Sequence, residues 1–96
     1  MRNARKELLE NLEGIEPVCA QINSSVKICL KKGHTHAEWL TFLTLLDFEY
    51  DSGYGSQNLF GIVWLDNGAW LEREEYDGSE WWEYKEYPTI PAELLT

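Results

Sequence analysis

The fold is decided by residues 59–87, which read LFGIVWLDNGAWLEREEYDGSEWWEYKEY. Asp66–Gly68 (DNG) and Asp77–Gly78 (DG) are strong short signals of a β-hairpin turn. The segment before the first turn, 59–65, is apolar on both faces, as a central strand is. The stretch therefore predicts a three-stranded antiparallel meander, which Pro88 and Pro91 bring to an end.

The amino-terminal part of the chain predicts one helix and one hairpin. In Asn3–Gly14, Asn3 can cap a short helix, leucines form an apolar stripe, and the glycine stops it. The segments 18–22 (VCAQI) and 26–30 (VKICL) alternate apolar residues with others. Such alternation is typical of strands, here joined through Asn23–Ser25.

A second helix is predicted after residue 34. Thr35 and Glu38 have the spacing of a capping box. The following apolar residues recur at helical intervals, and Leu40 and Leu45 widen the stripe, so we expect this helix to be buried. A strand at Phe48–Tyr50 and a glycine-rich loop follow it.

Together these elements predict a single α+β domain over residues 1–96. Two helices pack on an antiparallel sheet of about five to six strands, in the order α-β-β-α-β-β-β-β, with the three-stranded meander at the carboxyl terminus. No apolar run is long enough to span a membrane, and the amino terminus lacks the apolar region of a secretion signal. We therefore expect a cytoplasmic protein.

Charge is distributed unevenly along the chain. The net charge is −9, and residues 47–96 carry twelve acidic groups against two basic ones. Binding to nucleic acid depends on lysines and arginines that neutralise phosphates, so this half disfavours DNA or RNA as a direct ligand. It favours a partner with a basic surface, or high solubility alone.

Aromatic and acidic side chains share both faces of the last two predicted strands. Trp81 and Trp82 are adjacent in the chain, so they point to opposite faces. One interpretation is a sheet stabilised by cross-strand aromatic pairs and kept soluble by carboxylates. The other is a binding surface, because Trp and Tyr are frequent anchors of protein interfaces. The partner-binding residues predicted by the second interpretation are Trp70, Glu72, Glu74, Tyr76, Asp77, Glu80, Trp81, Glu83 and Tyr84.

The segment Gly61–Pro91 resembles the carboxyl-terminal third of small uncharacterised proteins of tailed bacteriophages and prophages. The resemblance lies in Trp64, the Gly68 turn, Trp70, Glu72, the run Tyr76–Trp82 and the closing prolines Pro88 and Pro91. No activity is attached to that family segment, so it implies no catalytic residue. It implies a context in which small accessory proteins bind and block host machinery, including defence complexes.

Other candidate sites have weaker support in the sequence. His34 and His36 with Cys29 lack the paired spacing of a zinc site, so we expect no metal and two solvent-exposed histidines. Lys31–His36 places basic groups beside a helix amino terminus, which attracts anions, although the capping box uses the same N–H groups. The loop Ser52–Gln57 lacks the lysine and spacing of a phosphate-binding loop.

Catalysis is not predicted. Neither Cys19 nor Cys29 has a neighbour in the sequence that would activate it. We expect both to be free thiols in a reducing compartment, with Cys29 as a small core residue. The prediction is a non-enzymatic, cofactor-free protein of phage or prophage origin that inhibits or modulates a host protein, such as a nucleic-acid-binding or defence complex. The alternative is a structural or accessory subunit whose exposed aromatics form a homodimer or larger homo-oligomer.

Overall fold

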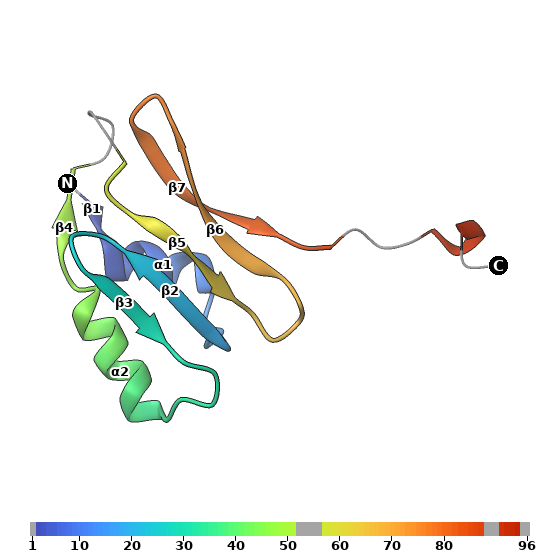
Figure 1. Ribbon diagram of the computed structural model, residues 1–96, viewed down its shortest axis with the longest axis horizontal. Coiled ribbons are helices and arrows are strands. Elements are labelled where there is room, and N and C mark those ends of the chain that lie inside the picture. The colour runs from blue at the N-terminus through green and yellow to red at the C-terminus, as the bar shows by residue number, and fades with distance from the viewer. Residues whose placement is uncertain (1, 52–56, 88–90, 95–96) are drawn as a thin grey trace.

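A computed structural model describes residues 2–51, 57–87 and 91–94 (Figure 1). Most of its strands form one antiparallel sheet in the order β3-β2-β5-β6-β7, and a two-stranded ribbon pairs β1 with β4. The predicted α+β class and the carboxyl-terminal meander are confirmed. The elements are β1 (Arg2–Asn3), α1 (Ala4–Leu12), β2 (Cys19–Asn23), β3 (Lys27–Leu30), α2 (His36–Leu45), β4 (Glu49–Tyr50), β5 (Phe60–Trp64), β6 (Trp70–Tyr76), β7 (Ser79–Lys85) and η1, a 3₁₀ turn at Ala92–Leu94.

The helix boundaries follow the capping residues. The Asn3 side chain accepts a hydrogen bond from the Lys6 backbone N–H at the start of α1. Thr35 and Glu38 form both hydrogen bonds of the predicted capping box at the start of α2. These side chains satisfy backbone N–H groups that have no partner inside a helix, which confirms both predicted helix starts.

The turns of the meander also form as predicted. Asp77 and Gly78 both have positive φ, at 51° and 85°, and they join a pair in which Tyr76 lies opposite Ser79. Positive φ at both central positions gives a two-residue turn whose twist matches the right-handed twist of the flanking strands. In the other turn the Asn67 side chain accepts a hydrogen bond from the Ala69 N–H. β5, β6 and β7 are therefore joined in register without a crossover.

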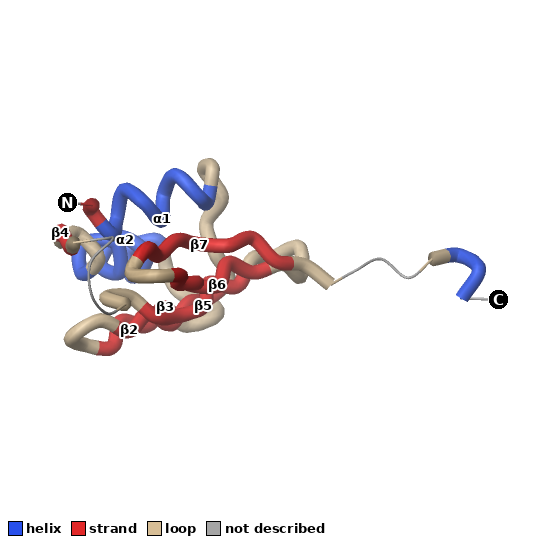
Figure 2. The backbone as a smooth tube through the Cα atoms, turned by 90° about the horizontal axis from the view of Figure 1, so that it is seen from above, coloured by secondary structure: helices blue, strands red, loops and turns tan. Residues whose placement is uncertain are grey.

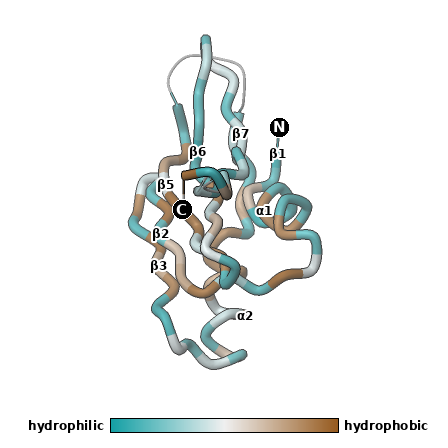
Figure 3. The backbone as a smooth tube through the Cα atoms, turned by 90° about the vertical axis from the view of Figure 1, so that its right-hand side faces the viewer, coloured by the Kyte–Doolittle hydropathy of each residue, from teal (hydrophilic) through white to brown (hydrophobic). Residues whose placement is uncertain are grey.

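Both helices pack on the same face of the main sheet, which we call the covered face (Figure 2). The core lies between these two layers. Figure 3 shows hydrophobic residues gathered in β2, β3 and β5, while the far end of the β6–β7 hairpin is hydrophilic. The largest fully buried side chains are Leu8, Ile22, Phe42, Leu46, Leu59, Val63 and Leu71.

Three expectations about the fold are wrong. The strand near Tyr50 lies outside the main sheet, because β4 pairs with the two residues that precede α1. Helix α2 is only partly buried, because it contacts β3 at the edge of the sheet. Leu40 and Leu45, predicted to widen its buried stripe, are 50% and 55% exposed. Cys29 is exposed rather than in the core, because it alternates with the buried residues of β3.

Neither helix of the described chain has the length or composition to cross a membrane. Strand β7 ends at Lys85, before the predicted proline stop, and Pro88 lies outside the described residues.

The two adjacent tryptophans of β7 should differ sharply in their contribution to stability. Trp82 is 5% exposed within the core, whereas Trp81 is 38% exposed on the other face. Trp82→Ala should therefore lower the free energy of unfolding by about 3–5 kcal/mol, and Trp81→Ala by about 1 kcal/mol or less. Urea denaturation of the two variants measures this difference, and equal losses would contradict the assignment of the two faces.

Candidate functional site

The face of the sheet opposite the helices has no described element packed over it. We call it the open face. Strand registers place residues of all five strands in rows across it; one row runs from Cys29 through Gln21, Ile62 and Glu72 to Glu83. Alternation along the strands assigns to it the side chains of Cys19, Gln21, Asn23, Lys27, Cys29, Phe60, Ile62, Trp64, Trp70, Glu72, Glu74, Tyr76, Ser79, Trp81, Glu83 and Lys85.

Three tryptophans lie on the open face. Trp64 of β5 is directly opposite Trp70 of β6, and Trp70 is opposite Lys85 of β7. Trp64 and Trp81 are exposed, whereas Trp70 is half-buried with its ring centroid 5.2 Å from that of Tyr87. Large aromatic surface is therefore available to a partner at two separate points of the sheet.

The carboxylates of the open face are partly neutralised. The Lys85 Nζ lies 2.7 Å from Glu72 and 2.5 Å from Glu74, so one lysine joins two acidic residues of β6. These hydrogen bonds raise the pKa of Lys85, and the bond from Lys85 lowers the pKa of Glu72. Glu83 accepts a hydrogen bond of 3.1 Å from the Trp81 indole N–H. The face is thus a mixed aromatic and charged surface, less acidic than its sequence predicts.

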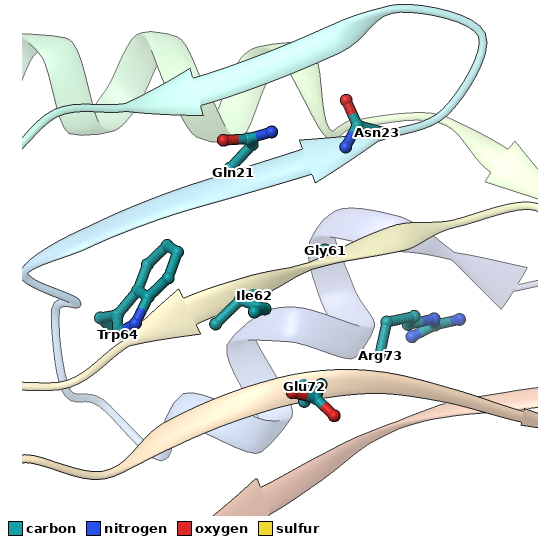
Figure 4. A pocket seen from close by; sticks show the side chains of 7 residues that line it. All are labelled: Gln21, Asn23, Gly61, Ile62, Trp64, Glu72 and Arg73. Atoms are coloured by element: carbon teal, nitrogen blue, oxygen red, sulfur yellow. The ribbon is translucent and has the colours of Figure 1, made fainter.

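A hollow of about 390 Å³ opens on this face between β2, β5 and β6 (Figure 4). Its lining combines the Trp64 ring, the Glu72 carboxylate and the amide side chains of Gln21 and Asn23. Gly61, Ile62 and Arg73 also line it, and the Arg73 side chain is buried and paired with Glu7 and Glu80. Within the described part of the chain, neither amide side chain has a hydrogen-bond partner. The hollow therefore offers an aromatic surface, a carboxylate and free amide groups to a ligand.

Gly61 brings two strands close together beside the hollow. Its φ is +147°, and a Cβ at this position would lie 2.2 Å from the Gln21 carbonyl oxygen. Any side chain would collide with the β2 backbone, so glycine is required for β5 to approach β2 this closely. The hollow is therefore shaped by the backbone as well as by its side chains.

A buried ion-pair network lies on the covered face, and its centre is Arg73 of β6. The side chain is 0% exposed, with its Nη2 2.9 Å from Glu80 of β7 and its Nη1 3.1 Å from Glu7 of α1. The Arg73 Nη2 also donates to the Tyr50 hydroxyl at 2.5 Å, and that hydroxyl donates to Glu7. Its Cζ lies over the Trp82 ring, 5.2 Å from the centroid. The network fixes the β6–β7 hairpin, and with it half of the open face, against the helical layer.

Glu80 belongs to this network and not to the binding surface. Besides Arg73, its carboxylate accepts hydrogen bonds from the backbone N–H groups of Asn58 and Leu59, at 2.7 and 3.0 Å. It is 2% exposed. The prediction that Glu80 contacts a partner is therefore wrong, because the residue lies on the covered face beside Trp82. Charge pattern alone gave no sign that one glutamate in this run is paired internally.

The other predicted site residues separate into groups. Trp70, Glu72, Glu74, Trp81 and Glu83 come together on the open face. Tyr76 lies on the same face at the end of β6, beside the turn that exposes Asp77. Tyr84 is exposed beside Leu71 on the side of the covered face.

The sequence prediction also omitted open-face residues of β2 and β5. They were missed because 59–65 is apolar throughout and predicts a strand buried on both sides. The polar residues Gln21 and Asn23, which pair with Ile62 and Phe60, mark this side as exposed once the pairing is known.

His34 is not a solvent-exposed histidine as predicted. Its side chain is 5% exposed, with the Nε2 2.9 Å from Glu16 and the Nδ1 2.9 Å from the Lys31 carbonyl oxygen. Burial opposes protonation, but the Lys31 carbonyl and Glu16 outweigh it and hold the pKa of His34 above its usual value. The histidine therefore joins the loop after α1 to the loop before α2. His36 is exposed as expected, with its Nδ1 3.8 Å from Glu16.

No three His, Cys, Asp or Glu residues of the described ranges gather as a metal site. Both cysteines are free thiols, and the loop 52–56 lies outside the described residues. Comparison with protein-family models, curated proteins and solved structures finds no match to this chain.

Two glutamates of β7 should respond differently to loss of charge. Glu80→Gln removes one partner of a buried arginine and should lower the free energy of unfolding by about 3–5 kcal/mol. Glu83→Gln changes an exposed carboxylate and should alter it by about 0.5 kcal/mol. Urea denaturation at neutral pH compares them; a Glu80→Gln protein as stable as Glu83→Gln would show that the network contributes nothing.

Tyr50 should make the protein sensitive to alkaline pH. Burial, together with its hydrogen bond to Glu7, raises the pKa of Tyr50 to about 12 from the usual 10. Between these values the unfolded chain loses the phenolic proton while the folded protein keeps it, so the free energy of unfolding should fall with rising pH. The loss approaches about 3 kcal/mol. Urea denaturation from pH 9 to 12 should show that the free energy of unfolding falls less with pH in Tyr50→Phe than in the wild type. Parallel curves for the two proteins would contradict the raised pKa of Tyr50.

Proposed function

We propose that this chain is a non-enzymatic binding protein whose open face docks on a basic surface of another protein. The observation that carries the proposal is a sheet face, uncovered by any described element, that exposes Trp64 and Trp81 beside carboxylates. Aromatic residues are enriched in interfaces, and a few of them usually supply most of the binding energy. Trp64 and Trp81 are the proposed anchors, with Trp70 between them.

The hollow beside Trp64 suits a basic side chain of the partner. A guanidinium group can stack on an indole ring while it donates hydrogen bonds to a carboxylate and to amide oxygens. Trp64 and the amides of Gln21 and Asn23 provide the ring and the amide oxygens around one opening. Glu72 provides a carboxylate, of which one oxygen already accepts a hydrogen bond from Lys85. The net charge of −9 would attract a basic partner over longer distances and repel a second copy of the chain.

The resemblance of 61–91 to phage and prophage proteins supplies the proposed setting. We place the protein in the cytoplasm of a bacterial host, where it would inhibit or modulate a host protein, such as a nucleic-acid-binding or defence complex. One form of such inhibition is mimicry of nucleic acid, in which carboxylates occupy the phosphate sites of a basic groove, and this needs a regular array of free carboxylates. Lys85 occupies two of the carboxylates on this face, which favours docking through the tryptophans over mimicry of a phosphate backbone.

Capture from bacterial lysate with matched variants tests the proposal. The open-face variant is Glu72→Gln, Glu74→Gln and Glu83→Gln, and the control removes the same number of charges at Glu10, Glu13 and Glu49, which are exposed outside the open face. Proteins captured by the wild type and by the control, identified by mass spectrometry, should be lost from the open-face variant. Association with a partner purified in this way should also slow as salt rises.

Trp81→Ala should weaken binding to the same partner by at least about tenfold while the protein stays folded. Retention of the partner by both the Trp81 and the triple glutamine variants would refute a role for the open face. Sedimentation at increasing concentration tests the alternative, since a homodimer abolished by Trp81→Ala would make this face a self-association surface.

A further inference from the structure

Strand β3 forms the edge of the main sheet at the end away from the β6–β7 hairpin. Its only pairing partner among the described strands is β2, so the outer backbone groups of Lys27–Leu30 have no strand beside them. Helix α2 runs next to this edge (Figure 1). We propose that the groove between β3 and α2 binds an extended, acidic peptide segment of a partner protein, which adds to the sheet as a further strand.

The groove has room for side chains of such a strand. It has a volume of about 350 Å³. Its lining comes from the strand side and from the helix, and consists of Cys29, Leu30, Lys31, Ala37, Glu38, Thr41, Phe42 and Leu45. Ala37, Thr41 and Leu45 follow one another at intervals of four residues, so they form a continuous stripe along α2. Leu45 remains 55% exposed. An added strand would supply backbone hydrogen bonds to β3, and its alternate side chains would cover this stripe, in which Leu45 is the large apolar residue.

The charges around the groove favour an acidic strand over a basic one. Lys27 and Lys31 stand at the two ends of β3, and Lys32 follows, all exposed. The one carboxylate in the lining, that of Glu38, already accepts a hydrogen bond from the Thr35 N–H in the capping box. If two copies of β3 paired antiparallel about Cys29, Lys27 of each copy would lie opposite Lys31 of the other. Like charges in that position are destabilising, so the lysines oppose self-pairing and favour an acidic strand.

The groove borders the open face at Lys27 and Cys29 but uses none of its tryptophans or carboxylates, and it involves two features of the sequence that the proposed function does not use. One is the basic cluster that begins at Lys31. The other is Leu45 on α2, which helical periodicity predicts to be buried but which is exposed beside the groove. Leu40, the second exposed leucine of α2, does not line the groove. The mode of binding is strand addition beside a helix, in which the backbone gives affinity and the side-chain stripe gives specificity.

Two synthetic peptides of equal length test the proposal on the full chain: one alternates Glu and Val, the other Lys and Val. Fluorescence polarisation should detect binding of the Glu–Val peptide and at least about tenfold weaker binding of the Lys–Val peptide. Amide chemical shifts should change at Lys27–Leu30 and along α2. Methylation of alternate backbone nitrogens of the Glu–Val peptide should abolish binding, because it removes the donors that pair with β3.

The matched variants are Leu45→Glu and Leu40→Glu, two leucines of α2 with similar exposure. Leu45→Glu should weaken binding of the Glu–Val peptide by about tenfold, and Leu40→Glu should leave it within about twofold. Lys31→Glu should weaken it as well. Equal effects of the two leucine variants, equal binding of the two peptides, chemical-shift changes confined to β5, β6 and β7, or a dimer that Leu45→Glu dissolves would each overturn the proposal.

Discussion

The buried ion-pair network around Arg73 joins α1 and the β1–β4 ribbon to the β6–β7 hairpin. Glu7 belongs to α1, Tyr50 to β4, and Arg73 and Glu80 to the β6–β7 hairpin. Arg2 of β1 donates to Glu7 at 2.8 Å and so extends the network to the amino terminus. The Glu80 carboxylate also holds the backbone just before β5. A buried charge that loses its partner is costly, so these segments must assemble together.

The network also explains how a long hairpin is fixed on a small domain. The paired register of β5 with β6 covers Ile62–Trp64, whereas β6 continues to Tyr76. Beyond that ladder, Glu80 takes the place of strand pairing by accepting the N–H groups of Asn58 and Leu59. The Trp82 ring then packs against the Arg73 guanidinium. Side-chain contacts therefore hold the hairpin to the rest of the domain where β5 and β6 are no longer paired.

Packing both helices on one face has two consequences for binding. The opposite face carries Trp64, Trp70 and Trp81 together with Glu72, Glu74, Glu83 and Lys85 of β6 and β7. This face provides the proposed docking site. The same arrangement places α2 beside the edge strand β3 rather than under the middle of the sheet, so one side of the helix stays uncovered. The two proposed sites thus lie on different parts of one sheet, with acidic groups at one and lysines at the other.

Local signals in the sequence determined much of the fold. Asn3, the Thr35–Glu38 capping box and the two hairpin turns act through neighbouring backbone groups, so their effects could be predicted from short stretches. The order of the meander followed from them. Strand alternation also showed that Trp81 and Trp82 point to opposite faces, but it could not show which one is buried, because each face mixes aromatic and acidic residues.

Contacts between distant residues decided the rest. The pairing of β1 with β4, the exposure of Leu45, and the burial of Glu80 depend on which segments meet in space. A run of glutamates in a sequence has the appearance of a uniform acidic surface. Only the tertiary structure shows that Arg73 neutralises one of them in the core and Lys85 joins two on the open face. The strength of a charge is set by its partners and its burial, and neither is a property of the local sequence.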